Sequence, residues 1–139
     1  MNPAAQTILD FWFKEISPKL WWAKSDEFDQ QIGLRFGTLH RAASRCELAT
    51  WRDTAAGRLA EIILLDQFSR NIYRDQADAF AQDPLSLALA QTAVAAGADT
   101  ELEPTQRAFL YLPYMHSESP LIHQQAVTLF SQPGLESNL

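Results

Sequence analysis

The chain has 139 residues, of which 47% are hydrophobic and 11% aromatic, a composition typical of one globular domain with a large core. The net charge of −6 gives little attraction for phosphate backbones, so nucleic-acid binding is not expected. The single cysteine, Cys46, excludes an internal disulfide and a four-cysteine zinc site. Without a secretory signal or a run of about 18 apolar residues, the sequence predicts a cytoplasmic protein that does not bind membranes.

Helix-start and helix-stop signals follow one another along the chain. Polar capping residues precede proline or acidic residues at several positions, as at Asn2-Pro3 and Asp83-Pro84, and this order is typical of helix N-termini. Six helices are expected: from about Pro3 to Phe13, from Ser25 to about Cys46, from Asp53 or Thr54 to about Asn71 or Arg74, from Asp83-Pro84 to Gly97, from Glu103-Pro104 to Pro113, and from Ser119-Pro120 to Pro133-Gly134.

No alternating, β-branched stretch competes with these helices, so the sequence predicts an all-α fold. Short connections between successive helices favour antiparallel helical hairpins, and three stacked pairs are the most economical architecture. No fixed internal repeat is found.

The expected third helix combines apolar residues around most of its circumference with a polar side. Asp66, Arg70 and Arg74 follow at steps of four residues, and Gln67 and Asn71 form a parallel pair beside them. Buried polar groups are costly unless they are paired. The set is therefore interpreted as a structural network, as a polar pocket between helices, or as a solvent-exposed face, in decreasing order of preference.

The expected second helix places Arg35 inside an apolar stripe that ends at Cys46. We expect Cys46 to be a buried, inert thiol. An unpaired buried arginine is unfavourable, so we expect Arg35 to form a salt bridge with Asp66, Asp83 or Glu118.

A second polar cluster, Tyr111 to Glu118, brings histidine, hydroxyl and carboxylate groups together, with His123 and Gln124 following. Neighbouring residues do not form a catalytic triad, because its members meet through the fold. A zinc site using His116, Glu118 and His123 matches no specific ligand spacing. Helix capping is the favoured role of the serines near Pro120, and neither a metal nor a cofactor is expected.

Several segments follow one another in a recognisable order: Trp12-Phe13, Phe28-Asp29, Arg35-Phe36, Trp51, the run from Leu64 to Arg74, the run from Ala79 to Asp83, the run from Phe109 to Pro113, His116-Ser117-Glu118 and Gln124. Together they resemble the bacterial family called domain of unknown function 924. The resemblance implies a right-handed, tetratricopeptide-like array and no assigned activity. It departs from the family's pattern at Ser69, Asp75 and Trp22, where proline, glycine and phenylalanine are usual.

Residues 1–139 are therefore expected to form a single all-α domain. The resemblance also implies that family members continue into a further C-terminal helix, which residues 1–139 are expected to lack. An open groove could then be filled by a neighbouring chain, so a homodimer is a hypothesis.

Two functions are consistent with the sequence. The favoured one is a binding or scaffold module for a protein or peptide partner. The alternative is a small-molecule-binding protein or an enzyme acting on an anionic ligand, although no catalytic motif is recognised. The candidate polar pocket comprises Arg35, Asp66, Gln67, Arg70, Asn71, Arg74, Asp83, His116, Ser117, Glu118 and Gln124.

Overall fold

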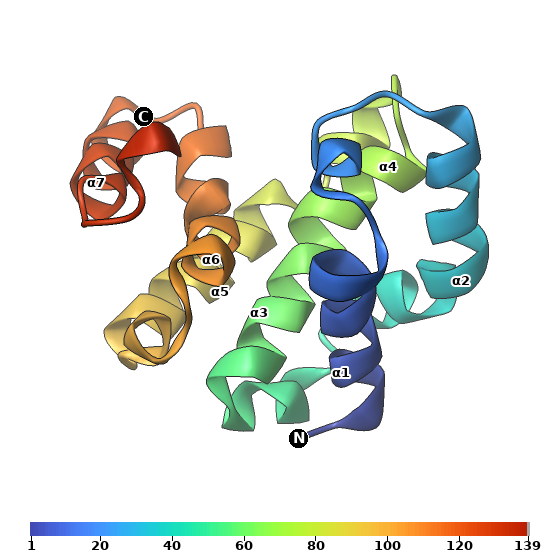
Figure 1. Ribbon diagram of the computed structural model, residues 1–139, viewed down its shortest axis with the longest axis horizontal. Helices are drawn as coiled ribbons and strands as arrows, with labels where there is room; N and C mark the ends of the chain where they lie inside the picture. The colour runs from blue at the N-terminus through green and yellow to red at the C-terminus, as the bar shows by residue number, and fades with distance from the viewer. Residues whose placement is uncertain (139) are drawn as a thin grey trace.

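A computed structural model describes residues 1–138, and this part of the chain is helical throughout, without a strand. Its centre is one continuous helical run in which α3 (Ala55–Ile63) passes through a π-helical turn (Leu64–Phe68) into α4 (Ser69–Ile72). Figure 1 shows α1 and α2 on one side of this run and α5, α6 and α7 on the other. The all-α class and the six expected helical segments are confirmed for the described residues.

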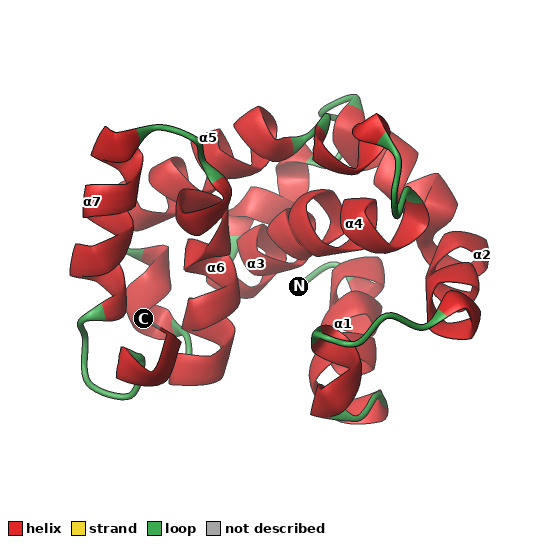
Figure 2. Cartoon of the chain, turned by 90° about the horizontal axis from the view of Figure 1, so that it is seen from above, coloured by secondary structure: helices red, strands yellow, loops and turns green. Residues whose placement is uncertain are grey.

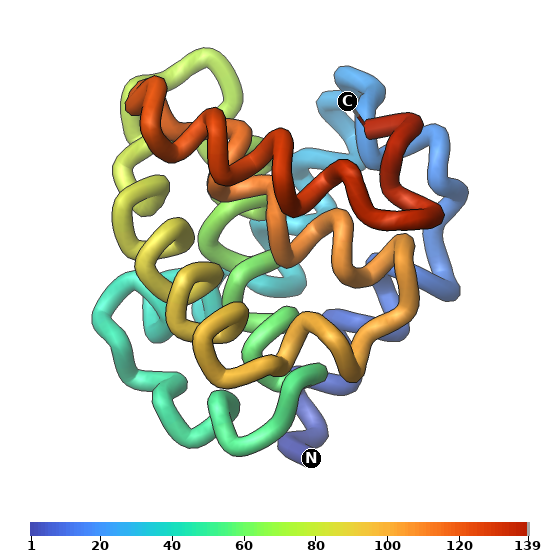
Figure 3. The backbone as a smooth tube through the Cα atoms, turned by 90° about the vertical axis from the view of Figure 1, so that its left-hand side faces the viewer, coloured from blue at the N-terminus to red at the C-terminus, as the bar shows by residue number. Residues whose placement is uncertain are grey.

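The remaining helices pack around the central run in two groups. Their bounds are Pro3–Asp10 for α1, Asp26–Ser44 for α2, Asp83–Ala95 for α5, Pro104–His116 for α6 and Pro120–Phe130 for α7. On one side α1 contacts α3 while α2 contacts α4, and on the other side α6 packs against both α5 and α7 (Figure 2). In Figure 3, α7 crosses over α6 on the outside of the molecule, away from the central run.

Most of the expected helix starts are confirmed by side chains that accept hydrogen bonds from the first backbone N–H groups. Asn2, Ser25, Thr54 and Ser119 each cap a helix in this way. The side-chain oxygen satisfies a donor that the helix itself leaves unpaired. Local sequence therefore determines where these four helices begin.

Two expectations about helix ends are wrong. Pro113 does not end its helix, because α6 continues to His116 with Pro113 buried inside it. Proline removes one backbone hydrogen bond, but burial of the neighbouring Leu112 and Tyr114 stabilises the last turn. Cys46 is exposed rather than buried, since α2 ends at Ser44 and the chain turns there with Cys46 at a positive φ of 60°.

The core is built from large aromatic rings where α1, α2 and the π-helical turn meet. Phe68 is fully buried, and its ring lies 5.2 Å from that of Phe36, 5.5 Å from that of Trp12 and 6.2 Å from that of Phe11, measured between centroids. Edge-to-face ring pairs add stability beyond the burial of their area. The aromatic core thus fixes the π-helical turn that also carries Asp66 and Gln67.

None of the helices among residues 1–138 is long and apolar enough to cross a membrane.

Replacing Phe68 by alanine should lower the free energy of unfolding by about 3–5 kcal/mol, because a buried ring is lost and a cavity remains. Phe80→Ala is the matched control, since Phe80 is 59% exposed, and its loss should stay below about 1 kcal/mol. Urea denaturation followed by tryptophan fluorescence measures both. Equal losses in the two variants would show that Phe68 is not a core anchor.

Candidate functional site

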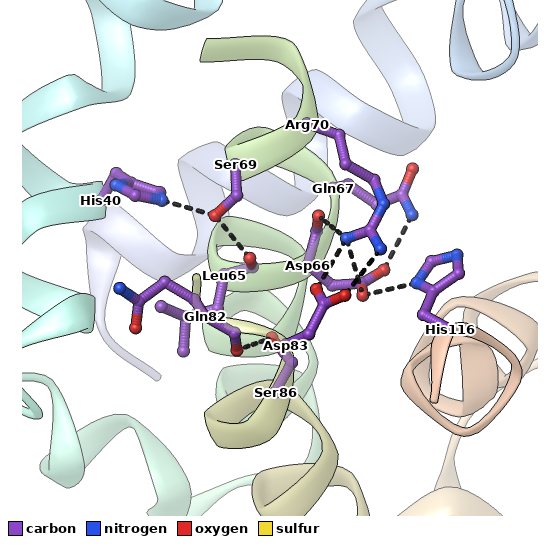
Figure 4. A network of polar contacts seen from close by, with 10 residues as sticks. All are labelled: His40, Leu65, Asp66, Gln67, Ser69, Arg70, Gln82, Asp83, Ser86 and His116. Atoms are coloured by element: carbon purple, nitrogen blue, oxygen red, sulfur yellow. Dashed lines mark hydrogen bonds and ion pairs between the residues drawn. The ribbon is translucent and has the colours of Figure 1, made fainter. Parts of the chain in front are cut away.

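Asp66 lies on the π-helical turn of the central run and is only 1% exposed. Its carboxylate accepts hydrogen bonds from Gln67 Nε2 at 2.9 Å and Arg70 Nη1 at 3.3 Å, and it contacts His116 Nδ1 at 2.7 Å (Figure 4). A buried carboxylate needs several donors to replace its lost water. Single π-helical turns are frequent at functional sites, and here the turn joins the aromatic core to a polar cluster.

Arg70 connects the central run to α5. Its Nη1 and Nη2 atoms donate to the two carboxylate oxygens of Asp83 at 2.9 and 3.0 Å, and Nη1 also donates to the carbonyl oxygen of Asp66 at 2.9 Å. The guanidinium carbon stands 5.3 Å from the centroid of the Phe80 ring. Paired, bidentate contacts of this kind hold arginine in one geometry.

His116 is the last residue of α6, and its ring reaches back to the central run. Because Nδ1 faces the Asp66 carboxylate, which is an acceptor, Nδ1 carries a proton and donates it in a hydrogen bond. In the neutral ring, Nε2 is then unprotonated and can accept a hydrogen bond. Among residues 1–138, no group forms a hydrogen bond with Nε2. The ring therefore presents an unengaged nitrogen next to open space.

That open space is a cleft of about 570 Å³ between the start of α5 and the end of α6. The residues that line it are Arg70, Phe80, Asp83, Pro84, Leu87, Pro113, His116, Ser117 and Glu118. One wall is apolar, and the other carries the polar groups that Asp66 and Arg70 hold in place. We call it the His116 cleft.

A separate polar cluster lies between α2 and the end of α4. Asp29 accepts hydrogen bonds from Arg74 Nε at 2.6 Å and from Asn71 Nδ2 at 2.9 Å. Burial raises the pKa of Asp29, but the hydrogen bonds from Arg74 and Asn71 outweigh it, so the pKa lies below its ordinary value. This cluster ties α2 to the central run and takes no part in lining the His116 cleft.

The expected salt bridge of Arg35 with Asp66, Asp83 or Glu118 is wrong. Arg35 instead pairs with Glu15 at 3.3 Å, and its side chain is 39% exposed. The guanidinium carbon lies 5.1 Å from the ring centroids of Phe11 and Phe36. The aliphatic stem and planar guanidinium of Arg35 cover the rings of Phe11 and Phe36, while the charge reaches water.

The candidate residues thus fall into three places. The structure brings Arg70, Asp83, His116, Ser117 and Glu118 together around the cleft, with Asp66 and Gln67 directly behind them. Asn71 and Arg74 belong to the Asp29 cluster, and Arg35 and Gln124 lie elsewhere, Gln124 being exposed on α7.

Sequence reasoning missed the apolar wall of the cleft, formed by Phe80, Pro84, Leu87 and Pro113. These are ordinary helix and turn residues in the sequence, and only the fold places them opposite His116. Among the described residues, no group of three or more His, Cys, Asp or Glu side chains is arranged to hold a metal ion.

Another missed contact lies on the opposite side of the central run from His116, where His40 Nε2 lies 2.7 Å from Ser69 Oγ (Figure 4). Ser69 donates its only proton to the carbonyl oxygen of Leu65 at 2.6 Å, so His40 Nε2 is the donor to Ser69. Burial lowers the pKa of His40, and the charge of Arg41 lowers it further, which keeps the ring neutral. The serine is therefore not an activated nucleophile.

These features define an all-helical protein with a polar cleft against its central helix. The chain belongs to the family described as "Bacterial protein of unknown function (DUF924)", whose model matches residues 8–138. This finding agrees with the resemblance carried by the sequence motifs.

A solved structure, described as "Structure of Protein of Unknown Function ATU0120 from Agrobacterium tumefaciens", is similar to this chain, with 37% sequence identity and a TM-score of 0.89. The match covers 96% of this chain and 77% of that one. No curated protein is significantly similar in sequence.

Replacing Asp66 by asparagine should lower the free energy of unfolding by about 3 kcal/mol, because it removes a buried negative charge and leaves the partly buried Arg70 without it. Asp83→Asn makes the same chemical change at a carboxylate whose side chain is 21% exposed, and its effect should be about 1 kcal/mol. Urea denaturation of both variants shows which substitution lowers the free energy of unfolding more. A larger loss for Asp83→Asn would contradict the central position of Asp66.

The lowered pKa of Asp29 predicts a pH dependence. The hydrogen bonds of Asp29 with Arg74 and Asn71 stabilise the fold fully when the pH is above 3.8, the pKa of Asp29 in the unfolded chain. This stabilisation is lost as the pH falls through the lower pKa that Asp29 has in the folded protein. The wild type should therefore exceed Asp29→Asn in stability at about pH 5, and the difference should shrink toward about pH 2.5.

Chemical denaturation between about pH 5 and about pH 2.5 measures the difference in the free energy of unfolding between the wild type and Asp29→Asn. Asp53→Asn, at an exposed position, should follow the wild type at every pH. A difference between the wild type and Asp29→Asn that stays constant down to the lowest pH would refute the assignment.

Proposed function

We propose that this protein is a helical binding module whose ligand occupies the His116 cleft. The contact between His116 Nδ1 and the buried Asp66 carboxylate carries the proposal, because it fixes the ring and leaves Nε2 free at the edge of a cleft. The packing of α6 against α5 and α7 supports a tetratricopeptide-like arrangement of the hairpins, a geometry suited to presenting grooves.

The engaged and unengaged groups of the cleft indicate what it binds. Arg70 already donates to Asp66 and Asp83, so it has little capacity left to clamp an anionic group. The unengaged polar groups are Nε2 of His116, which is an acceptor in the neutral ring, and the exposed carboxylate of Glu118, which is also an acceptor. The ligand should therefore carry donors, and a positive charge should favour it.

The apolar wall adds a second requirement. Phe80 is 59% exposed and lines the cleft, with the Arg70 guanidinium 5.3 Å from its ring centroid. Together with Leu87 and Pro113 it offers a surface for an aliphatic or aromatic group. A peptide segment of a partner protein with an apolar side chain next to lysine or arginine meets both requirements.

A second candidate is an enzyme that removes a proton from a neutral or cationic substrate. A histidine whose Nδ1 is held by a buried carboxylate is oriented to act as a general base through Nε2. In that case a bound compound would be chemically converted, and mass spectrometry of the incubated mixture would detect the product.

The substitution His116→Asn separates the structural role of His116 from the functional one. The asparagine amide can still donate to Asp66 as Nδ1–H does, but the free acceptor Nε2 is removed. His123→Asn, at an exposed residue of α7, is the matched control. Both variants should melt close to the wild type.

Binding is measured by calorimetry with N-acetyl-leucyl-lysine amide and with the corresponding glutamate peptide as the acidic probe. We expect the wild type and His123→Asn to bind the lysine peptide in preference, and His116→Asn to bind it about tenfold more weakly. Unchanged binding by His116→Asn, or a preference for the glutamate peptide, would refute the proposal.

A further inference from the structure

The C-terminal end of α2 carries two arginines that have no carboxylate partner among the described residues. Arg41 donates one hydrogen bond to Thr38 Oγ1 at 3.2 Å, and no side-chain bond is formed by Arg45. By contrast, Arg52, Arg70 and Arg74 each pair with a carboxylate at 3.0 Å or less. In a chain of net charge −6, two neighbouring arginines without acidic partners are notable.

Both arginines line the same pocket, which has a volume of about 280 Å³ and lies between α2 and the segment that follows α4. His40, Ser44, Tyr73 and Gln82 also line it, and Asp78 is its one carboxylate. Two arginines against one aspartate give the pocket a positive balance. It lies on the His40 side of the central run, opposite His116 (Figure 4).

Arg41 lies in the last turn of α2 and Arg45 directly follows its last residue, Ser44, so the two positive charges repel each other unless something neutralises them. The negative end of the helix dipole offsets part of this repulsion. The dipole does not account for the pocket or for the hydrogen-bonding groups beside it. Tyr73 contributes a phenol and Gln82 a side-chain amide to the same wall.

We propose that this pocket binds the phosphate group of a small phosphorylated compound. Arginine guanidinium groups match the oxygen geometry of phosphate and form charge-assisted hydrogen bonds with it. The volume lies just below the range of about 300–1,000 Å³ that is typical of sites for drug-sized ligands. It therefore fits a phosphate with a small organic group rather than a dinucleotide.

The position of the pocket suggests a connection with the His116 cleft. Gln82 lines the arginine pocket, whereas the next residue, Asp83, pairs with Arg70 at the cleft. A ligand that contacts Gln82 would therefore touch the residue that directly precedes Asp83. The phosphate site itself does not depend on the function proposed for the cleft.

Phenyl phosphate is the probe, and its binding is measured by calorimetry at constant ionic strength, with benzoate and inorganic phosphate as comparison ligands. The wild type should bind phenyl phosphate at one site, and its amide resonances of Ser44 and Tyr73 should shift on titration. The double variant Arg41→Gln/Arg45→Gln should bind about tenfold or more weakly.

Arg58→Gln is the matched control, because it removes the same charge from α3 outside the pocket. Binding by this control should equal that of the wild type. If the double variant does not fold, each single arginine substitution and Tyr73→Phe provide the same comparison.

Three results would overturn the proposal. They are no saturable binding by the wild type at about 10 mM probe, equal weakening in Arg58→Gln, and equal affinity for benzoate. Tight binding of inorganic phosphate alone would restrict the site to the free ion and would refute the organic ligand.

Discussion

The buried carboxylate of Asp66 is the group on which the arrangement of this protein depends. It is 1% exposed, and within residues 1–138 the donors to its negative charge come from Gln67, Arg70 and His116. Through Arg70 it is linked to Asp83 at the start of α5, and through His116 to the end of α6. The Asp66 carboxylate thus connects both walls of the cleft, the start of α5 and the end of α6, to the central helical run.

The same central run has a different chemistry on its two sides. Toward α5 and α6 it carries the carboxylate network, whose unengaged groups at the cleft are acceptors. On the other side Ser69 Oγ accepts a hydrogen bond from His40 Nε2, near the pocket with two arginines. The aromatic core around Phe68 keeps the π-helical turn rigid between them. This division suggests two ligands of opposite charge preference rather than one.

Much of this fold follows from local signals in the sequence. Capping residues such as Asn2, Ser25 and Thr54 act over a few residues, so the helices they begin are predictable. The pairing of Asp66 with Arg70 follows from helical spacing in the same way. Contacts that depend on distant elements could not be predicted from one sequence.

Three residues illustrate the limit. Arg35 has a long side chain that can reach several partners, and the fold places Glu15, at the end of the helical turn after α1, within 3.3 Å of it. Arg74 lies beyond Tyr73, where the helix ends, so it leaves the face of Asp66 and pairs with Asp29. The approach of His116 to Asp66 requires α6 to continue past Pro113, against the usual effect of proline.

The tautomer of His116 tests the central claim most directly. Nitrogen-15 NMR of the imidazole ring at neutral pH distinguishes a protonated Nδ1 from a protonated Nε2. The structure predicts a proton on Nδ1, held by Asp66, and an unprotonated Nε2 facing the cleft. A neutral ring that carries its proton on Nε2 instead of Nδ1 would contradict the account, because the cleft would then present a donor instead of an acceptor.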